Sequence, residues 1–391
     1  MSRILIIYAS MDPPTELAIL FLNRFSQYIN SSISAKSLRQ LRQDDVDNCD
    51  ILISIRTQNY FEAYVANYAK QRGKLYCLAL DDDFLAIPDY PIRRTIQYKS
   101  LMRCITLADV FWCVNDSLGK KLESLSPTGR YIRGDTAVDK SEIKEFSCKN
   151  DNVIKVVYYN NDGSLDAYNK IVCPFIQAVK VINKTPIEWH FIGLKPDVKD
   201  KDKEKIVLYD HMSLQEFKST LKNSNFSFGI APLADTEFCR GKYINKFVEY
   251  TCAGLPCIYS NVEPYSSFVR NGVDGILTGN SLDEWECSIN KLSDISVRKR
   301  IVENAQQVLF ERMSYESVCK KIIDQFPAFT DYKSREYDRK FKDVIAWKIG
   351  VIQGRCSIPL DLIIRIRGRL KCEGLRSLLS YSFKKLRGYI R

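Results

Sequence analysis

Short apolar runs alternate with amphipathic stretches along most of the chain. Apolar residues gather in runs that predict buried strands at 4–8, 50–54, 75–80 and 108–114. Between these runs, residues 15–29 and 61–70 carry apolar side chains at helical spacing. Strands that alternate with helices predict parallel β-α-β units, so we expect the first part of the chain to form one doubly wound sheet.

The alternation lapses around 137–152, where polar residues predict a linker, and then resumes. The second part predicts helices at 165–182, 213–223 and 243–253, and strands at 153–159, 188–193, 206–209, 226–231 and 256–260. The fold class is therefore α/β, with two Rossmann-like domains at 1–145 and 150–325 and a basic helical tail at 330–391. Ligands of such sheets bind beyond the carboxyl ends of the strands, so we expect the site in a cleft between the two domains.

Composition narrows the class of protein. The 391 residues suit two domains. The 13 cysteines form no C-x-x-C pair and lie partly inside apolar runs, which indicates free thiols in a reducing compartment such as the cytoplasm. Because there are only two histidines and no clustered cysteines, we expect no metal site. The N-terminal MSRILIIYAS predicts a first strand rather than a signal peptide, and no apolar run is long enough for a transmembrane helix.

Positive charge is concentrated at the C-terminal end of the chain. The net charge is +11, and residues 331–391 hold 16 Lys and Arg against 6 Asp and Glu. Basic and apolar residues mix at helical spacing in 355–391, which predicts an amphipathic helix on the anionic inner face of a membrane. The alternative is a helix that packs on the first domain with a solvated cationic face. We expect no nucleic-acid partner, because the tail has few aromatic residues and no recognised motif.

The candidate chemistry lies in residues 240–260. The predicted helix turns an apolar face inward and presents Lys246 and Glu249 on the other side. Its N-terminus, with Arg240 and Lys242 just before it, suits a diphosphate, because exposed amides and cations both attract phosphate. Glu249 can accept hydrogen bonds from two ribose hydroxyls. The alternative is a plain surface ion pair between Lys246 and Glu249.

Three runs in this half of the chain occur in a recognisable order: 247–256 (FVEYTCAGLP), 258–260 (IYS) and 272–277 (GVDGIL). They resemble the donor-binding half of GT-B glycosyltransferases, and in particular the retaining group often called glycosyl transferases group 1. Members of that group carry an E-A-x-x-x-G-x-P run, then a strand and an N-G-x-x-G loop. The resemblance covers roughly residues 153–325. It implies transfer of a sugar from a nucleotide diphosphate sugar, with no cofactor besides this co-substrate.

By this resemblance Glu249 holds the donor ribose, and Lys246 and Arg240 hold the diphosphate. Two departures bear on the donor site. Gly241 stands where the group has a glutamate that contacts the donor sugar, and 159–163 (YNNDG) replaces the usual Arg and Lys after the first strand. Arg240 and Lys242 can supply the missing positive charge.

Tyr265 completes the predicted donor-binding set of Arg240, Gly241, Lys242, Lys246 and Glu249. It lies where the group often places a backbone contact to the donor. The alternative is that its ring only packs in the interior.

Three consecutive carboxylates, Asp81, Asp82 and Asp83, follow the strand predicted at 75–80. They resemble a D-D-D-L/F turn found in a subset of bacterial surface-polysaccharide transferases. One of them is expected to orient or deprotonate the acceptor hydroxyl. The alternatives are an acidic N-cap cluster and the metal-binding D-x-D of GT-A enzymes, which the second half of the chain disfavours.

The leading hypothesis is a glycosyltransferase that moves a sugar to a glycan or lipid-linked acceptor in surface polysaccharide biosynthesis. A nucleotide-sugar epimerase of the same fold is a second possibility, which the shortage of histidines disfavours. A third is a catalytically degenerate, transferase-like scaffold, which Gly241 suggests.

Overall fold

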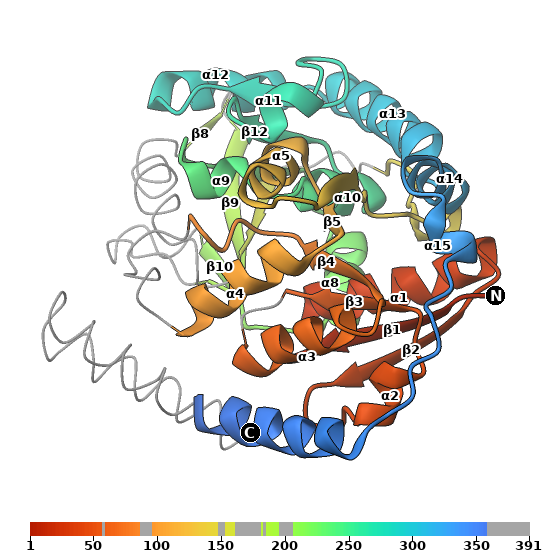
Figure 1. The fold of residues 1–391 in the computed structure, drawn as a ribbon. Coiled ribbons are helices and arrows are strands. Elements are labelled where there is room, and N and C mark those ends of the chain that lie inside the picture. The colour runs from red at the N-terminus through yellow and green to blue at the C-terminus, as the bar shows by residue number, and fades with distance from the viewer. Residues whose placement is uncertain are drawn as a thin grey trace, which may run out of the picture. The chain divides into compact units, whose positions relative to one another are not determined.

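The computed structural model describes residues 1–56, 59–86, 96–147, 153–160, 181–182, 185–194 and 206–357 (Figure 1). The chain divides into two compact units. Unit 1 is Met1–Gly134 with Lys321–Arg391, and unit 2 is Asp135–Lys320. The first boundary lies before the expected one at 145, because the segment ahead of residue 145 packs on unit 2. There the amide of Lys144 donates to the carbonyl of Cys252 at 2.8 Å, and Gln306 donates to the carbonyl of Lys144 at 2.8 Å.

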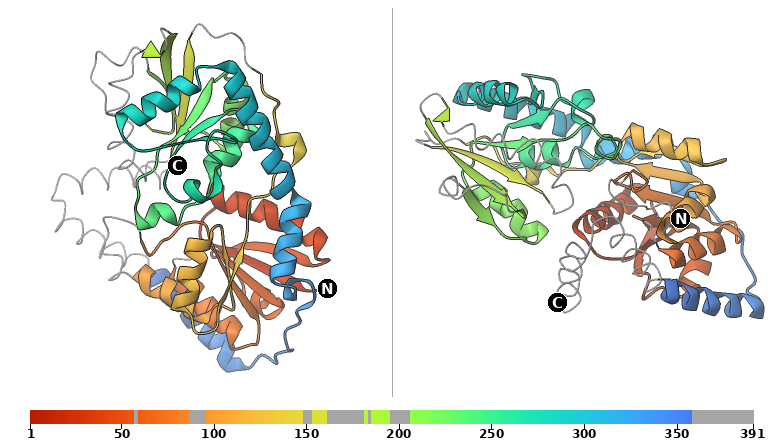
Figure 2. Two further views of the ribbon diagram at one scale, coloured as in Figure 1. Left: turned by 90° about the horizontal axis from the view of Figure 1, so that it is seen from above. Right: turned by 90° about the vertical axis from the view of Figure 1, so that its left-hand side faces the viewer.

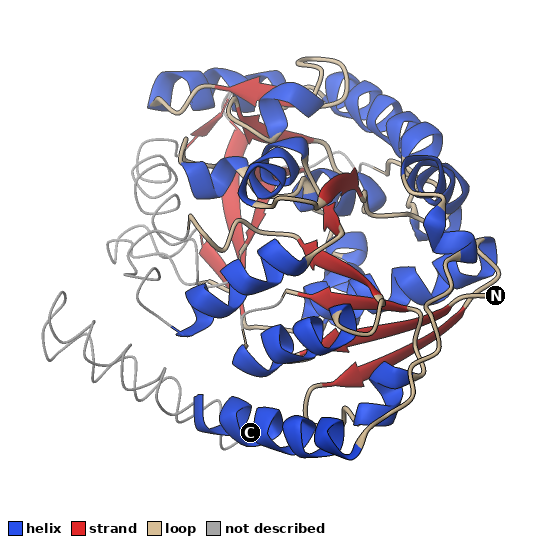
Figure 3. Ribbon diagram, in the orientation of Figure 1, coloured by secondary structure: helices blue, strands red, loops and turns tan. Residues whose placement is uncertain are grey.

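Unit 1 is built on six parallel strands in the order β2-β1-β3-β4-β5-β6. The strands, red in Figure 3, are β1 (Arg3–Tyr8), β2 (Ser32–Ser37), β3 (Ile51–Ile55), β4 (Leu75–Leu80), β5 (Val110–Cys113) and β6 (Arg130–Arg133). The predicted strands β1, β3, β4 and β5 are confirmed. Strands β2 (SISAKS) and β6 (RYIR) were not predicted, because these edge strands are polar and carry no apolar run.

Helices cover both faces of this sheet. They are α1 (Pro13–Tyr28), α2 (Gln43–Asp47), α3 (Tyr60–Lys70), α4 (Ile96–Leu107), α5 (Asp116–Leu125), α15 (Ala328–Asp331) and an unlabelled helix at 341–357, while α14 (Tyr315–Gln325) crosses the boundary of the units. Leu5 and Ile7 of β1 join the core beneath α3 and α4. On the other face Phe25 of α1 meets the rings of Trp112 and Phe329. The central strands of the sheet therefore carry buried apolar side chains on both faces.

Unit 2 has six parallel strands in the order β10-β9-β7-β11-β12-β13, and β8 pairs antiparallel with β9. The strands are β7 (Ile154–Tyr159), β8 (Val181–Ile182), β9 (Thr185–Ile192), β10 (Ile206–Tyr209), β11 (Phe228–Ala231), β12 (Cys257–Ser260) and β13 (Ile276–Thr278). In chain order the parallel strands run 3-2-1-4-5-6 across the sheet. The chain reverses its direction of travel between β7 and β11, which makes that point the expected ligand position of a Rossmann sheet.

The helices of unit 2 are α8 (Leu214–Asn223), α9 (Glu237–Arg240), α10 (Asn245–Cys252), α11 (Tyr265–Phe268), α12 (Leu282–Lys291) and α13 (Ile295–Arg312), with a short 3-10 turn at Lys140–Glu142. The helix predicted at 165–182 is wrong at its end, because Val181–Ile182 is strand β8, and residues 165–180 lie outside the described part. No helix among the described residues is long and apolar enough to span a membrane.

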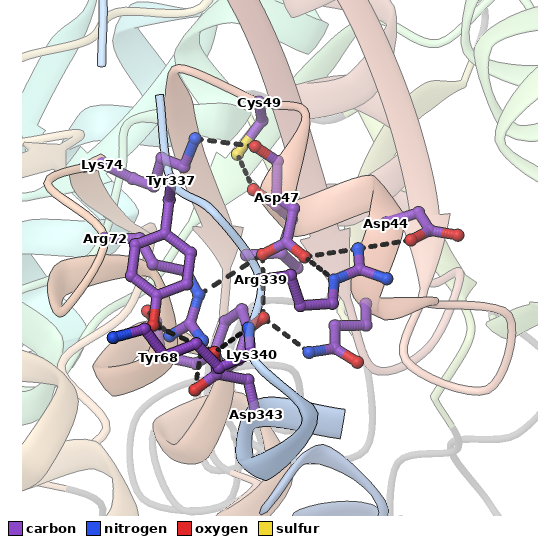
Figure 4. A network of polar contacts seen from close by, with 12 residues as sticks. Asp44, Asp47, Cys49, Tyr68, Arg72, Lys74, Tyr337, Arg339, Lys340 and Asp343 are labelled. Carbon is purple, nitrogen blue, oxygen red and sulfur yellow. Dashed lines mark hydrogen bonds and ion pairs between the residues drawn. The ribbon is translucent and has the colours of Figure 1, made fainter. Parts of the chain in front are cut away.

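The last part of the chain returns to unit 1 and is fixed there by a network of charges (Figure 4). Arg72 is its centre, since its guanidinium stacks 3.3 Å from the centre of the Tyr68 ring and 4.3 Å from that of Tyr337. It also pairs with Asp47 at 3.4 Å and with Asp343 at 3.2 Å. The returning segment is therefore a structural part of unit 1.

Asp50 provides a second anchor for the returning segment. Its side chain is 1% exposed, and it accepts hydrogen bonds from the amide of Arg3 at 3.0 Å and the hydroxyl of Ser334 at 2.9 Å. Burial alone would raise the pKa of Asp50, but the hydrogen bonds from Arg3 and Ser334 outweigh burial and hold this pKa well below its usual range.

We predict that Asp50→Asn lowers the free energy of unfolding of unit 1 by about 2 kcal/mol at pH 7, because the buried carboxylate that accepts hydrogen bonds from Arg3 and Ser334 is lost. Since the folded pKa of Asp50 is depressed, its stabilisation is present above about pH 4 and is lost as the pH falls. Urea titrations from pH 7 to pH 3 measure the free energy of unfolding, and hydrogen exchange assigns the change to unit 1. The difference in this free energy between the variant and wild type should shrink as the pH falls. The exposed Asp338→Asn is the matched control, and an equal loss in both variants would contradict the role of Asp50.

Candidate functional site

The position of helix α10 in unit 2 is set by Tyr250. Its ring lies where a side chain on Gly229 would be, since a Cβ there would come within 2.6 Å of the ring. Its hydroxyl donates to the carbonyls of Val157 at 3.2 Å and Ile230 at 3.3 Å. These carbonyls belong to β7 and β11, so Tyr250 fixes α10 across the two strands that flank the reversal point of the sheet.

Helix α10 ends as the sequence predicts and begins two residues later than expected. Gly254 has φ +74°, a conformation that favours glycine, and a Cβ there would lie 2.9 Å from the carbonyl oxygen of Lys144. No side chain caps the N-terminus of α10. The amides of Phe247 and Val248 donate to the carbonyl of Ile244, whereas those of Asn245 and Lys246 have no hydrogen-bond partner among the described residues. These two amides and the helix dipole can attract an anion.

Lys246 lies in this first turn and stands over aromatic rings rather than beside a carboxylate. Its Nζ is 4.5 Å from the centre of the Tyr159 ring and 5.6 Å from that of Tyr158. No ion pair of Lys246 occurs within the described ranges, so the surface ion pair with Glu249 is absent there. Burial and the nearby charge of Lys242 lower the pKa of Lys246 to about 8. A desolvated cation without a counter-ion is a suitable ligand for phosphate oxygens.

Glu249 follows one turn later and also faces the end of β7. One of its carboxyl oxygens accepts a hydrogen bond from the hydroxyl of Tyr159. Burial raises the pKa of Glu249 to about 8, so the carboxyl is largely protonated at pH 7. Its other oxygen has no hydrogen-bond partner among the described residues. That oxygen is available to a ligand hydroxyl at the carboxyl edge of the sheet.

The other cations of the predicted set are held differently. Arg240 ends α9 and is exposed, where it pairs with Asp235 at 2.8 Å. Lys242 is half-buried, with its Nζ 4.5 Å from the centre of the Phe238 ring. Gly241 between them is buried and caps α9. All three belong to the loop that leads into α10, so a diphosphate at the helix N-terminus would have cations on the chain just before it.

Tyr265 begins α11, just after β12, and its ring is buried. The ring centre is 4.7 Å from that of Tyr259. The side chain thus serves packing, which leaves only the backbone of Tyr265 for the predicted donor contact.

The three carboxylates that follow β4 in unit 1 have different environments. Asp83 is buried and committed to structure, since it accepts from the amide of Leu85 at 3.0 Å and pairs with Lys121 at 2.5 Å. Asp82 is half-buried beside them. Asp81 pairs with Arg56, and its Oδ1 is buried without a hydrogen-bond partner in the part of unit 1 that the structure describes. Of the three, Asp81 therefore has the free acceptor oxygen that a hydroxyl ligand requires.

The environment of Asp81 also shifts its pKa. Burial raises the pKa of Asp81 to about 6, although the charge of Arg56 opposes this shift. Arg56 follows β3, and it also lies 3.6 Å from Asp12, which follows β1. The cluster thus spans the carboxyl ends of β1, β3 and β4, where the strand order of unit 1 reverses. The catalytic role expected of Asp81, Asp82 and Asp83 stays a prediction.

Two residues of these sites, Tyr159 and Arg56, were not predicted as functional. Tyr159 was noted only as a departure from the pattern of the resembling group. Arg56 has φ +56° and follows an apolar strand, so only its position at the end of a predicted strand could have drawn attention to it. No group of three or more His, Cys, Asp or Glu suited to a metal ion occurs in the described segments.

Comparison with known proteins identifies the fold. No protein-family model and no curated protein sequence matches the chain. Among solved structures, HepE of Anabaena in complex with UDP-glucose matches 84% of this chain and 100% of its own, with 12% identity and a TM-score of 0.60. Sucrose-phosphate synthase of Thermosynechococcus elongatus matches 84% of this chain and 98% of its own, with 9% identity and a TM-score of 0.59.

A third structure, the lipopolysaccharide outer core galactosyltransferase WaaB in its apo form, matches 83% of this chain and 100% of its own, with 13% identity and a TM-score of 0.52. At such identities these likenesses establish the fold and not the activity. The chain has the two-domain GT-B fold, and that prediction is confirmed.

We predict that Glu249→Gln stabilises unit 2 at high pH. Because the folded pKa of Glu249 is raised, the neutral carboxyl is favoured, and stability is lost as the pH rises from about 4.5 through 8. At pH 9 the glutamine variant should exceed wild type by more than about 1 kcal/mol, and the difference should vanish near pH 5. Urea unfolding at both pH values measures this. The exposed Glu286→Gln is the control, and a destabilised Glu249→Gln at pH 9 would contradict the raised pKa of the Glu249 carboxyl.

Proposed function

We propose that the protein is a glycosyltransferase that moves a sugar from a nucleoside diphosphate sugar to a glycan or lipid-linked acceptor, with retention of configuration, in surface polysaccharide biosynthesis. The observation that carries the proposal is the pair Lys246 and Glu249 at the reversal point of the unit 2 sheet. Within the described part of the chain, Lys246 has no counter-ion and Glu249 has one carboxyl oxygen without a partner, and both side chains contact Tyr159 at the end of the same strand. They suit the diphosphate and the ribose of one nucleotide.

The donor site would promote the reaction by stabilising developing charge. The bond between the anomeric carbon and the diphosphate oxygen breaks as the bond to the acceptor oxygen forms, and negative charge develops on the leaving diphosphate. Lys246 and the uncapped N-terminus of α10 would stabilise that charge, with Arg240 and Lys242 adding to it. HepE has been solved with UDP-glucose, which supports the choice of a nucleoside diphosphate sugar as the donor class.

Asp81 is our candidate for the residue that binds the acceptor hydroxyl. Its buried Oδ1 has no hydrogen-bond partner among the residues that the structure describes, and its pKa of about 6 leaves it mostly ionised at pH 7 yet able to take up a proton. Asp82 is the second choice, and Asp83 is the least suited because Lys121 and the amide of Leu85 occupy it.

We place the protein in the cytoplasm, peripherally on the inner face of a membrane. The ten cysteines that the structure describes are all free, which suits a reducing compartment. The basic, apolar composition of 355–391 supports a contact with anionic lipid, where a lipid-linked acceptor would be found. WaaB, named for the lipopolysaccharide outer core, supports a role in surface glycan assembly.

We predict that one nucleoside diphosphate from the panel UDP, GDP, dTDP and ADP, with CMP as a monophosphate comparison, stabilises the protein against heat. A ligand at 100 times its Kd adds about 2.7 kcal/mol. Glu249→Ala should lose this thermal shift and the exposed Glu286→Ala should keep it. If no nucleotide shifts the thermal midpoint of wild type, the degenerate-scaffold hypothesis replaces the enzyme.

We further predict that affinity for the preferred diphosphate falls above pH 8. Deprotonation of Lys246 removes a positive charge and ionisation of Glu249 adds a negative one, so both changes oppose the anion. Each group can weaken binding by up to about tenfold per pH unit above its pKa. Isothermal titration from pH 7 to 9.5 should show this for the diphosphate and not for the matching nucleoside. Lys246→Met should bind weakly at pH 7 and show a shallower fall, and a wild-type affinity independent of pH would contradict the assignment.

A further inference from the structure

Helix 341–357 is held on unit 1 by one face only. Trp347 is buried among three rings of α3, with centroid distances of 5.6 Å to Phe61, 6.0 Å to Tyr64 and 5.1 Å to Tyr68. Gly350 and Gly354 allow this close approach, since a Cβ on either would lie within 2.6 Å of an α3 side chain. The packed face is therefore defined by a buried tryptophan and two glycines.

The opposite face of this helix exposes an apolar stripe. Four large side chains lie on it: Phe341 is 79% exposed, Ile345 45%, Ile349 49% and Ile352 60%. At 100° per residue they fall within an arc of about 80°, centred opposite the packed face. Isolated exposed apolar side chains are ordinary on a protein surface, but four along one helix line mark an interaction surface.

The charges beside the stripe are positive. Exposed Lys342 lies along one margin of the stripe, and exposed Lys348 and Arg355 lie along the other. The one acid of the helix, Asp343, is on the packed side and pairs with Arg72. An apolar stripe bordered by cations is complementary to an anionic lipid surface, where the apolar side chains enter the acyl region and the cations meet the head groups.

The direction of helix 341–357 determines which edge of the unit 1 sheet its C-terminal end approaches. Asp343 contacts Arg72 beyond the C-terminal end of α3, whereas Gln353 accepts a hydrogen bond of 3.2 Å from Tyr60 at its N-terminal end. These two contacts show that the helix runs antiparallel to α3. Figure 2 shows the helix in blue beside the orange helices of unit 1. Because α3 starts after β3, the chain leaves residue 357 near the carboxyl edge of the unit 1 sheet. The sequence beyond it, 358–391, holds nine Lys and Arg against two Asp and Glu.

We propose that the face formed by Phe341, Ile345, Ile349 and Ile352 is a rigid docking surface for an anionic lipid bilayer. Its four apolar residues lie outside the tail contact at 355–391, and they are part of the folded unit. It would hold the carboxyl edge of the unit 1 sheet at a fixed orientation to the membrane. The inference deepens the membrane contact of the proposed function and rests on it for the choice of lipid as the partner.

The test is sedimentation of the full chain with vesicles of phosphatidylcholine, with and without phosphatidylserine. We expect binding that requires phosphatidylserine, and a loss of about tenfold or more in Ile345→Ser/Ile349→Ser, because two apolar anchors are removed. Lys342→Gln/Lys348→Gln should also weaken binding, by about fivefold for each charge. The matched control, Leu20→Ser/Leu282→Ser, removes exposed leucines from other helices and should bind like wild type.

Equal vesicle binding by Ile345→Ser/Ile349→Ser and wild type would overturn the proposal and leave the tail as the membrane contact. A lower thermal midpoint or a smaller oligomeric mass in that variant would overturn it too, since protein would then cover the stripe. Sugar transfer to a water-soluble acceptor, measured without vesicles, should be unchanged in the variant. Failure of the docking surface and failure of the proposed enzyme are thereby distinguished.

Discussion

The contact between Tyr250 and Gly229 is the constraint on which the candidate donor site depends. The absence of a side chain at Gly229 lets the Tyr250 ring lie against β11, and the hydroxyl reaches the carbonyls of β7 and β11. This fixes α10 over the one point where the order of the sheet reverses. Lys246 lies about one turn before Tyr250, and Glu249 is its immediate neighbour. Both side chains are thereby directed at the carboxyl edge of the unit 2 sheet. A larger residue at position 229 would displace the helix and both side chains with it.

The same packing sets the electrostatics of the site. Burial disfavours the charged form of both Lys246 and Glu249, so their pKa values move toward one another and meet near 8. Neither group neutralises the other. Without a ligand, the burial of both groups therefore lowers the stability of unit 2. A nucleotide can relieve it, because phosphate supplies the missing negative charge and a ribose hydroxyl can bond to the carboxyl. Such uncompensated groups are typical of sites shaped for a ligand rather than for stability.

Sequence patterns predicted much of the fold, because buried parallel strands are continuous apolar runs. They found β1, β3, β4 and β7, the stop at Gly254 and the helix that carries Lys246. They missed β2 and β6, whose residues at the sheet edge are polar, and they extended a helix through the strand at 181–182. Secondary structure there depends on pairing partners that lie elsewhere in the chain.

Within the sites, sequence could name residues but not their partners. The bond between Tyr159 and Glu249 joins positions far apart in the chain, and so does the pair of Arg56 with Asp81. Likewise, Asp81 and Asp83 look equivalent in the sequence. Only the structure shows that Asp83 is paired with Lys121. The stripe at 341–357 was overlooked because an apolar residue on a helix is usually buried. Its exposure becomes visible only when Trp347 and the two glycines define the packed face.

The most direct measurement of the central claim is hydrogen exchange of the full chain with and without a saturating nucleoside diphosphate. If the reversal point of the unit 2 sheet binds the nucleotide, amides at 157–160 and at 241–249, which cover the loop before α10 and its first turn, should gain protection while most of the chain does not change. Protection that appears elsewhere and spares α10 would contradict the account.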